Sequence, residues 1–179
     1  PGSRLSFSAS AGTTYYILIG GQLNVSGQYL FSVNAPVNDD LNNAGVIGSL
    51  PFTTYQLVSG QRVSDTNTTA ASTVASDPTP TCAPSAGRSV WYRYEATDAT
   101  KLRLRTSGTS FDTVIAVYTG TTDNLVEVAC NNDDAGDTSS DLGFTPVAGT
   151  TYYFQVSGNS DQGGDLLFEV DVFPTPNND

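Results

Sequence analysis

Residues 113–118 read TVIAVY, and residues 90–94, 125–129 and 151–156 read VWYRY, LVEVA and TYYFQV. These runs are rich in β-branched and aromatic residues, which favour extended strands. TVIAVY is apolar on both faces of a strand, so we expect it to run through the middle of a sheet. Further runs of this kind lie at 15–19, 29–33, 102–104 and 166–172. Clusters of Gly, Asn, Asp and Ser separate the runs at spacings typical of antiparallel hairpins.

No stretch longer than about ten residues has a helical period. About nine strands predict an all-β fold, an antiparallel two-sheet β-sandwich of jelly-roll type with an extra N-terminal β segment. In KLRLR (101–105) we expect Leu102 and Leu104 to point inward and Lys101, Arg103 and Arg105 to point outward. This basic stripe is either a ligand face or, as we favour, pairs with acidic residues on neighbouring strands.

The chain contains a duplicated segment. Residues 3–33 and 140–170 align without a gap at an offset of 137 and are identical at 14 of 31 positions. The duplication predicts a tandem array with a period of about 140 residues. We therefore expect residues 1–35 to hold the C-terminal strands of a preceding repeat. Residues 36–173 should form one complete repeat, and residues 174–179 should lead into the next.

The predicted strands at 15–19 and 29–33 carry large apolar side chains. An isolated hairpin is marginally stable, and its open edges invite pairing. We expect a further polypeptide segment to complete the fold of residues 1–35. It is either a preceding repeat of the same polypeptide or a neighbouring subunit that receives the strands. A head-to-tail contact of the second kind that does not close builds a filament. The alternative is a simple truncation of a longer array.

The composition disfavours several classes of protein. The chain has 179 residues, with 18 acidic and 7 basic side chains and a net charge of −11, so it repels phosphate backbones and we expect no nucleic-acid partner. It contains no His, the usual general base and zinc ligand. No apolar run approaches about 18 residues, so we expect no membrane insertion. Asp clusters on polar loops keep low pKa values, which disfavours a glycosidase acid–base pair, and we expect no enzyme.

Cys82 and Cys130 are the two cysteines of the chain. They are either reactive thiols or, as we favour, a disulfide that pins a Thr-rich segment to the strand at 125–129. That segment, residues 64–81, has few large side chains and is predicted to be a long surface loop. A disulfide would imply an oxidising compartment. Asn67 and Asn24 begin N-glycosylation sequons and are candidate glycosylation sites.

Residues 131–137 read NNDDAGD and form the densest acidic stretch, directly after a predicted strand. Oxygen ligands on a Gly-containing turn suit Ca²⁺, which takes about six to eight of them. Asn38, Asp39 and Asp40 offer the same ligand types, and the two segments would share an ion if the fold brings them together. The alternative is a solvated turn rich in Asn and Asp.

Several ordered motifs resemble the bacterial pre-peptidase C-terminal domain over about residues 38–172. They are NDDL (38–41), GRSVWYRYEA (87–96), SFDTVIAVYTG (110–120), LVEVACNNDDAGD (125–137) and AGTTYYFQV (148–156). The family's SVWYRF motif matches Ser89 to Tyr94, with Tyr94 in place of Phe. Its CNDD loop matches Cys130 to Asp134, with one extra Asn.

The resemblance implies a β-sandwich module of secreted bacterial or archaeal proteins, without catalysis by the domain itself. Members often follow the catalytic domain of extracellular peptidases and often occur in tandem. The similar collagen-binding modules of clostridial collagenases bind calcium. Together with the density of oxygen ligands, this predicts a Ca²⁺ cofactor. The predicted ligands are Asp39, Asp40, Asn132, Asp133, Asp134 and Asp137.

These observations support two hypotheses for function. The first is a non-catalytic, calcium-stabilised β-sandwich repeat with a structural or adhesive role. It would be secreted or lie on the cell surface, and it could be the subunit of an extracellular filament joined by strand complementation. Its partners would be neighbouring copies of itself, adjacent repeats, or an extracellular polymer or cell surface. The alternative is an accessory substrate-binding or maturation module of a secreted peptidase or other hydrolase.

Overall fold

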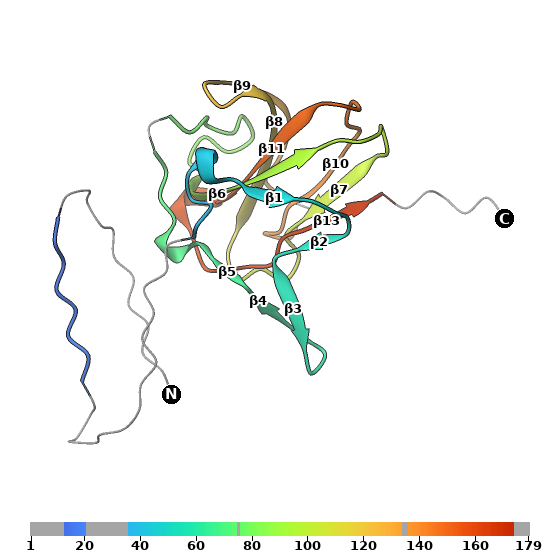
Figure 1. Cartoon of the computed structure of the whole chain (residues 1–179). Coiled ribbons are helices and arrows are strands. Elements are labelled where there is room, and N and C mark those ends of the chain that lie inside the picture. The colour runs from blue at the N-terminus through green and yellow to red at the C-terminus, as the bar shows by residue number, and fades with distance from the viewer. Residues whose placement is uncertain (1–12, 21–35, 75, 134–135, 174–179) are drawn as a thin grey trace.

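The computed structural model describes residues 13–20, 36–74, 76–133 and 136–173. Residues 36–173 contain two main sheets (Figure 1). The larger has the order β1 (Gly45–Ile47), β6 (Gly87–Glu95), β11 (Thr151–Gly158), β8 (Thr113–Thr121), β9 (Asn124–Asn131). The smaller has the order β10 (Asp141–Phe144), β7 (Leu102–Arg105), β13 (Glu169–Val172), β2 (Phe52–Thr53).

Short elements complete the described structure. Two ribbons pair β3 (Tyr55–Val58) with β4 (Gln61–Ser64), and β12 (Asp165–Leu166) with β5 (Thr66–Asn67). The 3-10 helices are η2 (Leu41–Asn43), η3 (Thr68–Ala70) and η4 (Asn159–Asp161). None of the described helices has the length and apolar character needed to cross a membrane.

The predicted all-β, two-sheet sandwich is confirmed. β11 lies at the centre of the larger sheet, where Phe154 faces Tyr92 of β6 on one side and Val117 of β8 on the other. These pairings are antiparallel, but β1 joins β6 in parallel. A parallel pair needs a long connection, and the chain from Ile47 to Gly87 supplies it.

The main core lies between the two sheets. Leu102 and Leu104 of β7 are buried there, as their alternation with basic residues predicts. Aromatic rings fill much of the space, and the rings of Tyr92 and Phe168 lie 5.0 Å apart. Aromatic pairs at such separations stabilise a core beyond the area that they bury.

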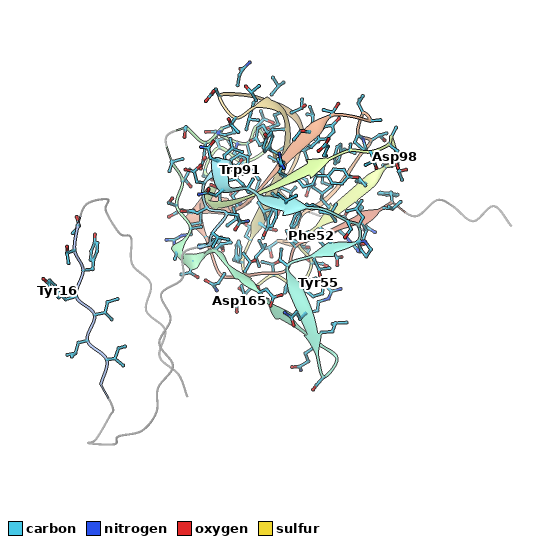
Figure 2. The ribbon with its side chains drawn as sticks, in the orientation of Figure 1. Tyr16, Phe52, Tyr55, Trp91, Asp98 and Asp165 are labelled. Atoms are coloured by element: carbon cyan, nitrogen blue, oxygen red, sulfur yellow. A yellow bond between two sulfur atoms is a disulfide. The ribbon has the colours of Figure 1, made fainter. Side chains whose placement is uncertain are left out.

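A second cluster covers the opposite face of the larger sheet, which we call the covered face. Trp91, Ala116 and Tyr118 are buried there together with Leu41 of η2. Figure 2 labels Trp91 among these side chains. Both faces of β8 are buried over residues 113–118, which explains its apolar residues at consecutive positions, and the prediction that it runs inside a sheet is confirmed.

The single strand predicted at 166–172 is divided in the structure. Leu166 belongs to β12 and residues 169–172 to β13, which lie in different sheets. Threonine side chains hold the chain between them, because Thr109 Oγ1 accepts from the Leu167 N–H at 3.1 Å and Thr54 Oγ1 accepts from the Phe168 N–H at 3.0 Å. These bonds replace strand pairing at the two positions.

The prediction of a plain surface loop at 64–81 is correct only in part. Ser64 ends β4, and β5 and η3 follow directly. Thr68 is buried, and its backbone N–H donates to the Gly164 carbonyl at 2.8 Å. Short polar strands of this kind lack the apolar periodicity by which strands are recognised in a sequence.

The strand predicted at 15–19 is not formed in this structure. Residues 13–20 adopt no regular secondary structure, and the side chains of Tyr16 and Leu18 are 95% and 98% exposed. In Figure 2, Tyr16 lies apart from the sandwich. A β-strand is defined by its pairing with a neighbouring strand, which its own sequence does not supply. The strand predicted at 29–33 lies outside the described residues.

Candidate functional site

Residues 38–40 directly precede η2, and each has a structural contact. Asn38 is buried and bonds reciprocally to Trp91, whose carbonyl accepts from Asn38 Nδ2 at 2.9 Å and whose N–H donates to the Asn38 carbonyl at 2.8 Å. The Asp39 carboxylate accepts from the N–H and the hydroxyl of Ser72, at 2.6 and 2.9 Å. Asp40 caps η2 by accepting from the Asn42 N–H at 2.8 Å.

Asp77 adds a third carboxylate near Asp39 and Asp40. It is partly buried, and its Oδ2 accepts from the Ser89 hydroxyl at 2.9 Å and from the Val74 N–H at 3.2 Å. Burial raises the pKa of Asp77 above its ordinary value, and the nearby charges of Asp39 and Asp40 raise it further. Asp77 has no acidic neighbours in the Thr-rich segment, so the sequence carries no local signal for it.

The acidic stretch 131–137 turns back on itself through side-chain contacts. Asn131 Nδ2 donates to the Asp133 carbonyl at 3.1 Å, and Asn132 Nδ2 donates to the Asp133 carboxylate at 3.2 Å. The Asp137 carboxylate accepts from the Ser139 hydroxyl at 3.1 Å. Asn132 Oδ1 is buried and accepts no hydrogen bond from the described residues. Asp134 lies outside those residues.

The calcium site predicted from the two acidic segments stays a prediction. No hydrogen bond or ion pair there joins residues 38–40 to residues 131–133 or 136–137. In the same part of the chain, no three acidic or cysteine side chains cluster closely enough to hold a metal ion. Asp39 and Asp40 lie near Asp77.

Cys82 and Cys130 form a disulfide in the structure, with their Cα atoms 5.8 Å apart. This is the pairing favoured from the sequence, and it joins the segment before β6 to β9. A second contact lies beside it, because the Thr81 N–H donates to the Glu127 carboxylate at 2.9 Å. The Thr81 hydroxyl also donates to that carboxylate. The segment is therefore held against β9 by both a covalent and a polar link.

Two residues of the basic stripe, Arg103 and Arg105, pair with acidic neighbours, as we favoured from the sequence. The third, Lys101, precedes β7, and its Nζ lies 4.2 Å from the centre of the Phe173 ring. Arg103 forms an ion pair with Asp141 of β10. Arg105 lies 2.5 Å from Glu169 and 3.0 Å from Asp171, both on β13. These ion pairs join adjacent strands of the smaller sheet, so they stabilise the pairing of those strands.

Of the two sequons, Asn67 lies within the described residues and Asn24 does not. Asn67 Oδ1 accepts from the Thr69 N–H at 3.0 Å and so caps η3. Its Nδ2, the atom that a glycan would modify, donates to Asp165 at 2.5 Å. A glycan at this position would have to displace that contact.

The duplicated segment occupies two different environments in one chain. Residues 15–19 correspond to residues 152–156 of β11 at the offset of 137. Phe154 is fully buried in the main core, whereas its counterpart Ile17 is 46% exposed. Gln155 is buried on the covered face, whereas its counterpart Leu18 is in solvent. Sequence suited to a central strand thus lies exposed at residues 15–19.

Comparisons with known proteins gave matches among solved structures alone. No protein-family model matches the chain. No curated protein matches it either. Among solved structures, the chain is similar to the pre-peptidase C-terminal domain of collagenase from Bacillus anthracis, with 15% sequence identity and a TM-score of 0.35. The match covers 48% of this chain and 76% of that domain.

Proposed function

We propose that this chain is a non-catalytic, extracellular β-sandwich repeat with a structural or adhesive role, and that successive copies join by strand complementation into a filament. The observation that carries the proposal is the exposure of residues 15–19, which repeat the pattern of a central strand. The proposal also includes a bound calcium ion that stabilises the module.

The exposed segment has a strong physical reason to find a partner. Burying an Ile, Leu or Val side chain is worth about 1.5–3 kcal/mol relative to leaving it in water. Ile17, Leu18 and Ile19 are 46%, 98% and 45% exposed, so each gains from a contact that covers it. Strand addition to another sheet is also a common mode of recognition, in which main-chain hydrogen bonds contribute to affinity.

Two further features support the location and the cofactor. The Cys82–Cys130 disulfide is typical of proteins that mature in oxidising compartments. Asn132 Oδ1 is a buried acceptor without a hydrogen-bond donor among the described residues, beside the Asp133 carboxylate. Such oxygen atoms are the ligands that Ca²⁺ prefers. Asp133, Asp134 and Asp137 would supply the negative charge.

The proposal is tested by measuring assembly of the full chain by light scattering and negative-stain electron microscopy. The chain should form polymers, and Leu18→Asp should reduce the polymer mass at least about tenfold by placing a charge in the contact. Val147→Asp is the matched control, because Val147 is also an exposed apolar residue, at 64%. It should assemble like the unmodified chain.

Two results would contradict the filament. One is a chain that stays monomeric at all concentrations, and the other is equal assembly of Leu18→Asp and the unmodified chain. A monomer that binds an extracellular polymer such as collagen in a pull-down would instead favour an accessory module of a secreted hydrolase.

A further inference from the structure

The edges of the two main sheets differ greatly in length. β1 and β9 border the larger sheet, and β10 and β2 border the smaller one. β1 has three residues, β10 four and β2 two, whereas β9 has eight. The exposed segment 13–19 is seven residues long, and a strand of that length pairs along its whole course only with an edge of similar length. β9 is the longest edge of these two sheets in the described residues, and its open part can pair with part of the segment.

Most of the edge of β9 is open in the described structure. At its end Ser140 Oγ donates to the Asn131 carbonyl at 3.2 Å, so the chain leading into β10 covers that point. From Asn124 to Val128, the described residues provide no backbone hydrogen bond on the side away from β8. The register shift between Val117 and Tyr118 makes Val128 the extra residue of a bulge in β9, so Asn124–Glu127 is the regular part of the open edge.

The side chains along this edge also suit an apolar partner. Val126 and Val128 are 57% and 48% exposed. Neither Lys nor Pro occurs in β9, although proteins commonly use both to protect edges. Glu127 is the single charged residue of the strand, and Thr81 already holds its carboxylate. Because residues 13–19 are uncharged, a contact here brings no additional carboxylates together between chains of net charge −11.

Exchange of the segment for β11 of another copy is disfavoured by one buried residue. Gln155 Oε1 accepts a hydrogen bond from the Tyr118 hydroxyl at 3.0 Å on the covered face. The segment 13–19 carries Leu18 at the equivalent position, and leucine has no acceptor. The exchange would break this buried bond, whereas addition to an edge leaves β11 and its contacts unchanged.

We infer that β9 of one copy accepts residues 13–19 of a second copy as a sixth strand of the larger sheet. This inference rests on the proposed function and identifies the surface through which it acts. The donor segment and the acceptor edge are different surfaces of the same chain, so the contact is head to tail and repeats from copy to copy.

Site-directed crosslinking tests the pairing. Copies carrying Leu18→Cys are mixed with copies carrying Val126→Cys, and a short bismaleimide joins thiols that lie close together. The native cysteines are both in the disulfide, so the introduced thiols are the reactive ones. Val46→Cys on β1 is the matched control, because Val46 is 64% exposed on the opposite edge of the same sheet. The adduct with Val126→Cys should exceed that with Val46→Cys at least about tenfold.

A second pair of variants separates the inference from the proposed function. Val126→Lys should abolish assembly by placing a charge on the open edge, whereas Val46→Lys should leave it unchanged. If both variants assemble like the unmodified chain, or if the two adducts form equally, the assignment to β9 is overturned and the filament proposal stands. If the unmodified chain does not assemble, the proposed function itself fails.

Discussion

The Tyr118 hydroxyl donates a hydrogen bond to Gln155 Oε1, 3.0 Å away, and both side chains are buried on the covered face. This bond distinguishes the strand that lies in the sandwich from its duplicate at residues 13–19, where Leu18 replaces the glutamine. Burial raises the pKa of Tyr118, and the nearby Glu127 carboxylate raises it further, so the hydroxyl stays protonated and remains a donor.

Gln155→Leu should therefore lower the free energy of unfolding by about 1 kcal/mol, because the hydroxyl loses its acceptor. Urea unfolding measures the change. The control is the same substitution in a Tyr118→Phe variant. No hydroxyl is present there, so Gln155→Leu should lower the free energy of unfolding by less. Equal losses in the two backgrounds would show that the bond contributes nothing measurable.

Removing the disulfide should destabilise the sandwich strongly. The two cysteines are 48 residues apart, and the chain-entropy model assigns a loop of that length about 4 kcal/mol. The double variant Cys82→Ser, Cys130→Ser should show this loss in urea unfolding, and a reductant should reproduce it in the unmodified chain. Two free thiols in a non-reduced digest of native material would contradict both the bond and the extracellular location.

Tyr92 should make the protein sensitive to alkali. Burial raises its pKa from 10.0 to about 12, an effect that the neighbouring Asn38 and Thr66 side chains partly offset. The folded protein therefore holds this proton more tightly than the unfolded chain. The resulting stability is complete below pH 10 and is lost as the pH rises toward 12, by on the order of 2–3 kcal/mol.

Tyr92→Phe should flatten this decline in the free energy of unfolding. The Tyr92 hydroxyl makes no hydrogen bond of ordinary geometry, so the variant should be as stable as the unmodified chain at pH 7. Tyr16→Phe is the control, because that ring lies in solvent. An unchanged alkaline slope in Tyr92→Phe would contradict the assignment.

Calcium should raise the melting temperature by several degrees, and EDTA should reverse the effect. An ion that binds only the folded chain stabilises it by about 2.7 kcal/mol at a concentration of 100 Kd. The double variant Asp133→Asn, Asp137→Asn should lose the response, whereas Asp123→Asn, in the turn between β8 and β9, should keep it. Identical melting curves with calcium and with EDTA would rule out the predicted site.

The sequence alone determined the fold class and most of the long strands. The runs at 90–94, 113–118, 125–129 and 151–156 all lie in strands of the larger sheet, because their apolar, β-branched pattern is a local property that tertiary contacts reinforce. The pairing of Cys82 with Cys130 followed from the absence of other cysteines. The inward orientation of Leu102 and Leu104 followed from their alternation with basic residues along the strand.

The tertiary structure decided which segments meet. Asp39 and Asp40 lie near Asp77, and the basic residues of β7 face Asp141, Glu169 and Asp171. Short strands such as β1 and β5 exist because neighbours already in place offer hydrogen bonds, not because of their own propensity. Contacts between residues far apart in sequence depend on the order of strands in the sheets, and no local pattern encodes that order. For the same reason the segment 13–19 has the sequence of a strand but adopts no regular secondary structure here.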